Sequence, residues 1–464
     1  MLELAFQADR ASGEPLYRQL ELYLRGLIET GRLTPGTQLP ASRTLSESLG
    51  LARNTVNQAY QGLTTDGLLR SHVGQGTFVA GRLREVTPPE ASPRPFAWEG
   101  LAARRQRRLQ FPAGFALPAS PRIDLAPGQV DRATLPASEL KRAYGRVLSR
   151  LESLGDAVDP RGWLPLRRAV ARSLVSRGIS CDTQEVMIVS GAQQALDLVA
   201  RALVDPGDTV ALEQPGYFGA AAAFSAAEAN LVGVGVDDRG LCTDELARIV
   251  GSQRVKLVYT TPAVQSPTGV ALSEARRRAL LALADAEQLP IVEDDYDSEL
   301  RHGTPPVPAL KQLDRAGQVI YLGTFSKALF AGLRIGYVVA PPPLLARMAL
   351  MRWASDFHSD AVTQAALVDL LESGALERHV RRVRQLYTER RVALEEALAR
   401  HMPEGTRVTP PAGGNAFWLR LPDETDMDAL HAAAAHARIA YGRGEAFALP
   451  DGPAAAEARR HVLL

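Results

Sequence analysis

From Ile123 onward, short apolar runs alternate along the chain with longer segments of helical periodicity. Apolar runs of about four to eight residues between turn signals are typical of buried strands. Strands separated by helices predict an α/β fold with a mostly parallel sheet, whose ligands lie at the carboxyl ends of the strands. The expected strands are 186–190, 209–213, 255–260 and 289–293, and the expected helices are 193–203, 217–229 and a segment that starts at Ser273.

The last part of the chain has a different pattern. From about Pro342 it is mainly helical, with an arginine-rich helix expected over 377–391 and a strand-like segment over 415–421. These elements predict a second, smaller α+β subdomain at the C-terminal end. The whole chain has 464 residues, 46% of them hydrophobic. Because domains commonly have roughly 150 residues, we expect two or three of them.

Residues 15–80 have the pattern of a small DNA-binding module. Three segments of helical periodicity are followed by two short strands, and a glycine-containing turn separates the second helix from the third. This order predicts a helix-turn-helix with a hairpin wing. Long polar side chains such as Arg53 and Asn54 at the start of the third helix suit hydrogen bonds to base edges in the major groove. A small helical packing domain with a solvated polar face is the alternative.

The same segment resembles the GntR-type winged helix over its whole length, through the motifs PLYRQL, LPASR, LGLARNTV, DGLL and GTFV. The family usually has Ser or Thr at the position of Ala52, so we expect a weaker N-cap on the third helix here. The resemblance implies DNA contacts for Ser42, Arg43, Arg53, Asn54, Thr55, Gly74, Gln75 and Gly76. We therefore assign a winged-helix domain to 1–80.

A linker is expected over 81–121, because seven prolines interrupt regular structure there. It contains a basic cluster, Arg104, Arg105, Arg107 and Arg108. Such a cluster forms a solvated face more often than a DNA contact. The remaining domain is expected over 122–464.

One lysine of this domain has an unusual setting. The run from Val319 to Leu322 predicts a strand, and Lys327 follows in a turn of small hydroxylic residues, seven residues before Arg334. A lysine amine forms a Schiff base with an aldehyde, while hydroxyls and a guanidinium hold a phosphate. Pyridoxal phosphate requires both. A solvated lysine after a strand is the alternative, although the chain has only three other lysines, Lys141, Lys256 and Lys311.

Further candidate residues follow other predicted strands. Gly191 and Ala192 open a helix whose N-terminus suits an anion. Tyr217 follows a strand exit, where it can stack on a pyridine ring. Asp294 ends a buried-looking strand, and a carboxylate beside the pyridine nitrogen keeps that nitrogen protonated. Each residue alone is common in helix starts, cores and turns, but their order along one sheet favours a single cofactor site.

From Asp159 to Leu421 the chain resembles fold-type I aminotransferases, most closely the MocR group of regulators, in which such a domain follows a GntR-type winged helix. The motifs are SGAQQALDL, EQPGYFG, VEDDYDSE, TFSK and GLRIGY. The resemblance implies pyridoxal phosphate on Lys327, with Asp294 at the pyridine nitrogen and Tyr296 near the ring hydroxyl. It also implies homodimers with sites near the subunit interface. The remaining implied cofactor contacts are Tyr217, Ala192, Gln193, Thr324, Ser326, Arg334 and Ser266.

Two departures from the family pattern concern turnover. Ser266 stands where aminotransferases usually have an asparagine bonded to the ring hydroxyl. The family normally continues with a carboxylate-binding arginine on a short strand, whereas this sequence ends at Leu464. On these two grounds we expect little or no transaminase turnover.

The composition narrows the functional classes. The net charge of +1 favours neither nucleic acid nor membrane as a whole-chain partner, so such a partner must meet a local surface. Two cysteines without paired histidines predict neither a disulfide framework nor a zinc site. No signal peptide or apolar run of about 18 residues is present. We expect a cytoplasmic regulator that binds double-stranded DNA and senses an amine or amino acid through a Lys327 aldimine. A catalytically active aminotransferase that carries a DNA-binding domain is the alternative.

Overall fold

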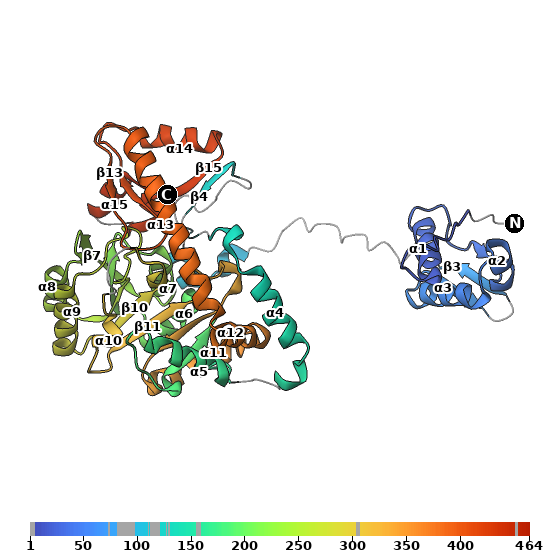
Figure 1. Ribbon diagram of the computed structural model, residues 1–464, viewed down its shortest axis with the longest axis horizontal. Coiled ribbons are helices and arrows are strands. Elements are labelled where there is room, and N and C mark those ends of the chain that lie inside the picture. The colour runs from blue at the N-terminus through green and yellow to red at the C-terminus, as the bar shows by residue number, and fades with distance from the viewer. Residues whose placement is uncertain are drawn as a thin grey trace. The chain divides into compact units, whose positions relative to one another are not determined.

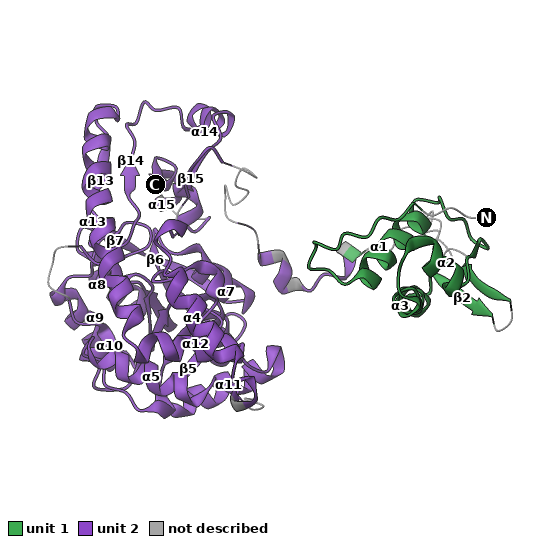
Figure 2. Ribbon diagram, turned by 45° about the vertical axis from the view of Figure 1, so that its right-hand side comes forward, with its two compact units in different colours: residues 1–98 green, residues 99–464 purple. Residues whose placement is uncertain are grey.

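The computed structural model describes residues 5–72, 75–80, 98–109, 111, 121–126, 128, 130–154, 159–302, 307–450 and 453–464. The predictions for Gly74 and for linker residues 81–97, 110 and 112–120 lie outside these ranges. The chain divides into two compact units, 1–98 and 99–464, which are coloured separately in Figure 2. We describe each unit by itself.

The N-terminal unit packs three helices against a small antiparallel sheet of order β1-β3-β2. Its interior contains Leu20, Leu24, Val56 and Leu63, all completely buried. These positions are the apolar faces expected from the helical periodicity. The elements are α1 (Leu16–Glu29), β1 (Gln38–Leu39), α2 (Ser42–Leu49), α3 (Arg53–Thr65), β2 (Leu69–His72) and β3 (Gly76–Val79). A helix-turn-helix with a hairpin wing is thus confirmed.

The starts of α2 and α3 can be compared with the prediction: the first differs from it and the second agrees with it. The family resemblance places Ser42 and Arg43 before the second helix, but they are the first two residues of α2. Ala52 is the N-cap of α3 and provides no side-chain hydrogen bond, as its missing hydroxyl predicts. Gly50 ends α2 in the left-handed conformation (φ 62°), which glycine adopts without steric cost.

The C-terminal unit contains an eight-stranded sheet of order β5-β12-β11-β10-β9-β6-β7-β8. Five of these strands form one parallel set, β11-β10-β9-β6-β7, while β12 and β8 run antiparallel to their neighbours. The strands are β5 (Val186–Val189), β6 (Thr209–Gln214), β7 (Asn230–Asp237), β8 (Gly240–Leu241), β9 (Val255–Thr260), β10 (Ile291–Asp295), β11 (Val319–Thr324) and β12 (Gly336–Val339). The predicted, mostly parallel α/β sheet is confirmed.

Helices cover both faces of this sheet (Figure 1). Buried side chains of α6, α7 and α11 pack on one face, and those of α5, α12, α8 and α9 pack on the other. This burial explains why the strands are continuous apolar runs. The helices are α4 (Ala137–Leu148), α5 (Leu164–Val175), α6 (Ala192–Leu203), α7 (Phe218–Ala226), α8 (Thr243–Ser252), α9 (Glu274–Glu287), α10 (Leu310–Leu313), α11 (Pro342–Asp356) and α12 (Ala361–Glu372).

Two predicted boundaries were wrong for local backbone reasons. Strand β10 begins at Ile291, two residues later than expected, because Gln288 is left-handed (φ 51°) and Pro290 has no N–H to donate to the ladder. The strand also continues to Asp295, so Asp294 lies within it. Helix α7 ends at Ala226 and not at Ala229, since Glu228 is also left-handed (φ 61°).

A second sheet of order β13-β14-β16-β15-β4 forms the smaller α+β subdomain. Its strand β4 comes from the start of the unit and pairs in parallel with β15, so the subdomain is not built only from the C-terminal part of the chain. The elements are β4 (Ile123–Leu125), α13 (Ala375–His401), β13 (Arg407–Thr409), β14 (Trp418–Arg420), α14 (Met427–His436), β15 (Ile439–Arg443), α15 (Pro453–Ala458) and β16 (His461–Leu463).

Short 3₁₀ turns complete the chain at η1 (Trp98–Leu101), η2 (Arg104–Arg108), η3 (Arg132–Thr134), η4 (Leu151–Leu154), η5 (Thr183–Glu185), η6 (Ser298–Leu300), η7 (Ala331–Leu333) and η8 (Gly444–Phe447). Within η2, the Arg108 guanidinium donates to the carbonyl oxygens of Glu228 (3.0 Å) and Ala229 (3.4 Å). Arg108 is also exposed, so these bonds add a contact to the solvated basic face that was expected.

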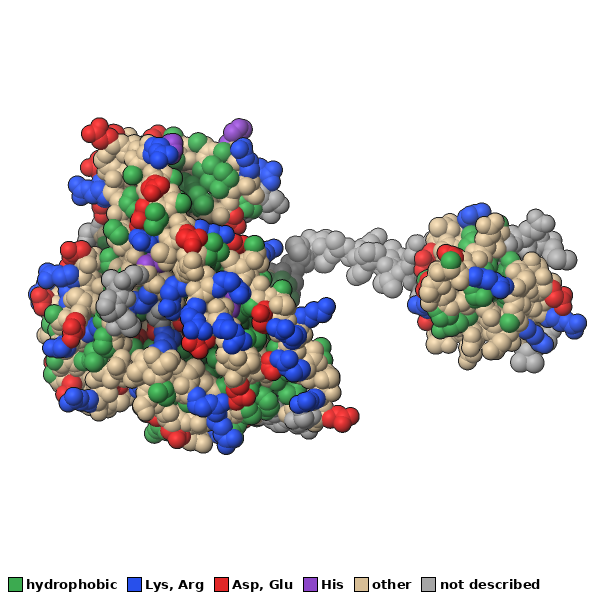
Figure 3. Space-filling model, in the orientation of Figure 1, with side chains coloured by type: hydrophobic (Ala, Val, Ile, Leu, Met, Phe, Trp, Pro, Cys, Tyr) green, Lys and Arg blue, Asp and Glu red, His purple; other side chains and the backbone are tan. Residues whose placement is uncertain are grey.

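The arginine-rich helix α13 is longer than predicted and has an exposed basic side. Arg378, Arg381, Arg382 and Arg384 are exposed on it. Figure 3 shows Lys and Arg side chains gathered on this face, with carboxylates interspersed. Among the helices in the described ranges, none has the length and apolar character needed to cross a membrane.

Candidate functional site

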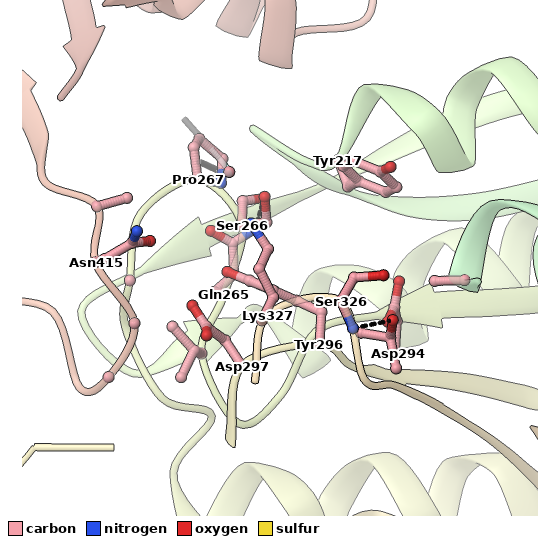
Figure 4. A pocket seen from close by; sticks show the side chains of 18 of the residues that line it. Tyr217, Gln265, Ser266, Pro267, Asp294, Tyr296, Asp297, Ser326, Lys327 and Asn415 are labelled. Atoms are coloured by element: carbon pink, nitrogen blue, oxygen red, sulfur yellow. Dashed lines mark hydrogen bonds between the residues drawn. The ribbon is translucent and has the colours of Figure 1, made fainter. Parts of the chain in front are cut away.

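A cavity of about 310 Å³ lies where the strands of the large sheet end. Residues from distant parts of the sequence meet there because the carboxyl ends of parallel strands share one edge of the sheet. The lining includes all ten predicted cofactor contacts: Lys327, Asp294, Tyr296, Tyr217, Ala192, Gln193, Thr324, Ser326, Arg334 and Ser266. Figure 4 shows several of these side chains around the cavity.

Lys327 is held by a well-packed loop directly after β11. Its neighbours Phe325, Ala328 and Leu329 are buried in the core. The imidazole of His379 on α13 lies 2.9 Å from the carbonyl oxygen of Ala328. These contacts fix the loop while the lysine side chain lies on the cavity. Burial lowers the pKa of Lys327, which favours the neutral, nucleophilic amine.

Asp294 has one occupied and one unoccupied carboxylate oxygen. The hydroxyl of Tyr259 on β9 donates a 2.9 Å hydrogen bond to Oδ2. Oδ1 is buried, and it has no hydrogen-bond partner among the residues that the structure describes. Burial raises the pKa of Asp294 to about 7, although the Tyr259 bond opposes that shift. The carboxylate is thus poised to accept a proton or a hydrogen bond.

Gly191, α6 and Arg334 form a concave corner of the cavity. Gly191 precedes α6 with φ 92°, a conformation that favours glycine. A Cβ at this position would lie 3.5 Å from the nearest guanidinium nitrogen of Arg334. Arg334 itself has φ 53°, an uncommon conformation for a residue with a side chain. The corner therefore combines a helix N-terminus with a guanidinium, and both attract anions.

Hydroxyl groups border the same corner. The backbone N–H of Ser326 donates to Oγ1 of Thr324 at 3.1 Å, which fixes the turn that leads into Lys327. Both residues line the cavity.

Tyr217 is the N-cap residue of α7 and is tied to α6 through Gln193. The Tyr217 hydroxyl donates to Oε1 of Gln193 at 3.3 Å, and Nε2 of Gln193 donates to the Gly219 carbonyl oxygen at 2.8 Å. The Gln193 side chain therefore positions the tyrosine ring, which is a contact that sequence reasoning did not predict.

Glu213 was missed as part of the supporting shell. This buried carboxylate accepts hydrogen bonds from the hydroxyls of Thr260 (2.5 Å) and Thr261 (2.6 Å) and from Nε2 of Gln265 (3.1 Å). It links the end of β6 to the end of β9 and to the loop that precedes Ser266. A glutamate at the end of an otherwise apolar strand was the available signal, because a buried charge requires partners.

Asp297 and Asn415 also line the cavity and were not predicted. Asp297 is only 5% exposed, and its Oδ1 has no partner within the described ranges. The fourth acidic residue of VEDDYDSE was the signal for it. Figure 4 shows Asp297 and Asn415 on the opposite side of Lys327 from Asp294 and Tyr217.

In the N-terminal unit, the predicted DNA-contacting residues lie at the starts of α2 and α3 and on the wing. Arg43, Arg53, Asn54, Gln75 and Gly76 are exposed, whereas Ser42 and Thr55 are half-buried. Arg43 forms an ion pair with Glu47 (3.2 Å). Nε2 of Gln38 donates to the Gln75 carbonyl oxygen at 2.8 Å, which anchors the wing to β1.

Comparison with known families agrees with this architecture. Residues 16–79 match the family described as bacterial regulatory proteins, gntR family, and residues 121–455 match aminotransferase class I and II. The HTH-type transcriptional regulator YdfD of Bacillus subtilis is 31% identical, with 94% of this chain and 91% of that protein aligned. The probable rhizopine catabolism regulatory protein MocR of Rhizobium meliloti is 34% identical over 92% and 86%.

A solved aminotransferase shares the fold of the larger unit. LysN, the alpha-aminoadipate aminotransferase of Thermus thermophilus, superposes with a TM-score of 0.73 at 30% identity. The match covers 80% of this chain and 93% of LysN. Since full-length regulators and this enzyme both match, the chain belongs to the MocR-type transcriptional regulators, in which a gntR-family helix-turn-helix domain precedes an aminotransferase class I and II domain.

Proposed function

We propose that this chain regulates transcription by holding pyridoxal phosphate on Lys327 and sensing an amine or amino acid there. The observation that carries the proposal is the cavity lined both by the half-buried Lys327 and by Asp294, whose Oδ1 has no partner among the described residues. When bound, pyridoxal phosphate supplies an aldehyde that bonds to amines and a pyridinium ring that withdraws electrons.

The residues present fit this cofactor in three respects. Oδ1 of Asp294 lacks a partner in the described parts of the chain, as required of an acceptor for a protonated ring nitrogen. The corner of Gly191 and Arg334 offers N–H groups and a guanidinium to a phosphate. Lys327 is half-buried, and desolvation lowers the pKa of its amine. LysN, which has the same fold, has been solved with N-(5'-phosphopyridoxyl)-L-leucine.

We also propose that the winged helix binds double-stranded DNA through α3 and the wing. Exposed Arg53 and Asn54 at the start of α3 present guanidinium and amide donors that base edges accept. The gntR-family match over 16–79 supports this assignment.

A homodimer is part of the proposal. The outer side of α11 and the residue after it expose three large apolar side chains: Leu350 (65%), Trp353 (58%) and Phe357 (58%). The rings of Trp353 and Phe357 lie 6.1 Å apart. Such clustered apolar exposure is typical of an association surface.

The cofactor assignment is tested by adding pyridoxal phosphate to the purified protein and reducing it with borohydride. We expect a visible absorbance band and a covalent adduct that maps to Lys327, both absent in Lys327→Ala. Lys256→Ala is the matched control, because Lys256 instead pairs with Asp208 at 3.3 Å. An adduct that maps to Lys256 or Lys311 would refute the assignment.

An active aminotransferase is the rival function, favoured by the likeness to LysN and by the presence of Lys327, Asp294 and Arg334. Our proposal expects an amine to change the absorbance and the DNA affinity with little keto-acid product. The Ser266 side chain is too short to replace the asparagine amide that aminotransferases usually place near the ring. Multiple turnover with 2-oxoglutarate at ordinary enzyme rates, roughly 1 to 1000 per second, would establish the rival function.

A further inference from the structure

Asp297 is a buried carboxylate that the proposed cofactor contacts leave unused. It follows Tyr296 at the end of β10 and is the N-cap residue of η6, where it makes no side-chain capping bond. Its Oδ1 has no hydrogen-bond partner among the described residues, yet the residue lines the cavity. Figure 4 shows it across Lys327 from Asp294, so it lies away from the proposed ring-nitrogen contact.

The loop of Gly413 and Gly414 fixes the position of this carboxylate. Gly414 has φ 79°, and a Cβ added to it would clash with Oδ2 of Asp297. The loop is itself held, because the Gly414 N–H donates to the Leu300 carbonyl oxygen at 2.9 Å and the His302 imidazole lies 2.7 Å from the Gly414 carbonyl oxygen. The carboxylate is therefore held against this loop, and both the loop and Asp297 line the cavity.

The charge balance leaves Asp297 in need of a donor. Burial raises the pKa of Asp297 and so disfavours its ionised form, and the positive charge that opposes this shift is that of Lys327, which is also attracted to Asp294. No hydrogen bond to Oδ1 of Asp297 comes from a cation in the described parts of the chain. A buried carboxylate without a partner is costly, so a ligand that brings a positively charged donor relieves that cost.

We propose that Asp297 selects the effector by binding a second ammonium group, so that the preferred effectors are aliphatic diamines. This inference rests on the proposed function, because the first amine of the same molecule is the one sensed at Lys327. A carboxylate at the far end of the effector would meet Asp297 as a like charge and bind more weakly.

The test uses the full-length protein loaded with pyridoxal phosphate. Absorbance titrations compare 1,3-diaminopropane, 1,4-diaminobutane and 1,5-diaminopentane with n-butylamine and 4-aminobutanoate. We expect the best diamine to bind about 10- to 100-fold more tightly than n-butylamine, the usual range for a hydrogen bond to a charged group. In Asp297→Asn this ratio should fall to near one. Asp238→Asn is the matched control, since it removes one exposed carboxylate outside the cavity and should keep the wild-type ratio.

Wild-type protein alone can overturn the inference, if n-butylamine or 4-aminobutanoate binds as tightly as the best diamine. An unchanged ratio in Asp297→Asn would overturn it too. If the loaded protein responds to none of these amines, the role of Asp297 fails, whereas the proposed function would still stand for α-amino acids. Equal binding of a non-diamine by wild type, or an unchanged ratio in Asp297→Asn, overturns only the role of Asp297 and leaves the proposed function standing.

Discussion

Tyr259 donates a 2.9 Å hydrogen bond to Oδ2 of Asp294, while Oδ1 of the same carboxylate is buried without a partner among the described residues. The tyrosine is buried on the neighbouring strand β9 and fixes the orientation of the carboxylate. The free oxygen is therefore presented by a rigid element, which suits the recognition of a flat ring. Its ionisation has consequences for stability.

Asp294 should make the cofactor-free protein less stable as pH rises. Burial raises the pKa of Asp294 from 3.8 to about 7, so the folded state binds more protons than the unfolded state between these values. Stability must then fall as pH increases from about 4 to about 7. Asp294→Asn should not show this loss. The unfolding free energy of the variant minus that of wild type should therefore be at least about 1 kcal/mol larger at pH 8 than at pH 5.

Urea unfolding at the two pH values measures this difference. Glu293 and Asp297 also have raised pKa values, about 7 and about 6, but both remain in the variant and cancel in the comparison. Asp238→Asn provides the control. A variant whose stability follows the wild-type pH dependence would show that Asp294 titrates normally.

Arg334→Lys should weaken pyridoxal phosphate binding about tenfold or more. A lysine keeps the charge but loses the planar, bidentate geometry that suits a phosphate. It would also adopt the left-handed backbone conformation of residue 334 and place an ammonium group, not a guanidinium, on the side of the cavity near Gly191. Equilibrium dialysis measures the affinity, with Arg248→Lys on the exposed side of α8 as the control. Equal affinity in both variants would remove Arg334 from the phosphate site.

The double variant Arg53→Ala, Asn54→Ala should lose specific DNA binding. Each good bidentate base contact is worth about 1 to 3 kcal/mol, so we expect a loss of roughly 5- to 150-fold or more. The assay uses a duplex that wild-type protein selects from a random pool, measured at two salt concentrations, because released counterions weaken binding as salt rises. Arg32→Ala changes an exposed arginine outside α2, α3 and the wing and is the control. Retention of wild-type affinity by the double variant would exclude α3 as the reading helix.

Local sequence patterns predicted those features that depend on neighbouring residues. Helical periodicity located α3, and β-branched and apolar runs located β9 and β11. The residues after each strand could be placed at one site because strand order in a parallel sheet brings their ends together. Lys327 and Asp294 were found in this way.

Features that depend on distant pairing could not be predicted. Strand β4 is three exposed residues, and only its pairing with β15, more than 300 positions later, makes it a strand. The partners of Glu213 come from β9 and the loop after it, so no spacing in the sequence indicates them. Asp297 was overlooked because an acidic residue after a strand is usually solvated, and its burial results from the distant Gly414 loop.

Helix α7 begins at the cavity and ends near a contact with the predicted linker. Tyr217 lines the cavity at the start of α7, and Arg108 binds the Glu228 and Ala229 carbonyl oxygens just beyond its end. Arg108 belongs to η2, which lies within the predicted linker and follows η1 in the chain. A shift of α7 that accompanies ligand binding would therefore act on the anchor of the linker.

Arg108→Ala should reduce the effect of an amine on DNA affinity without removing the response of the cavity. Coupling between two sites is a free energy, so its loss appears as a ratio of DNA affinities with and without amine that moves toward one. Fluorescence anisotropy measures that ratio, and the absorbance titration shows whether the amine still binds. Arg105→Ala is the matched control, because Arg105 lies in the same exposed turn and is also an arginine. If Arg108→Ala and Arg105→Ala keep the same ratio as wild type, the signal does not pass through the contact of Arg108 with the end of α7.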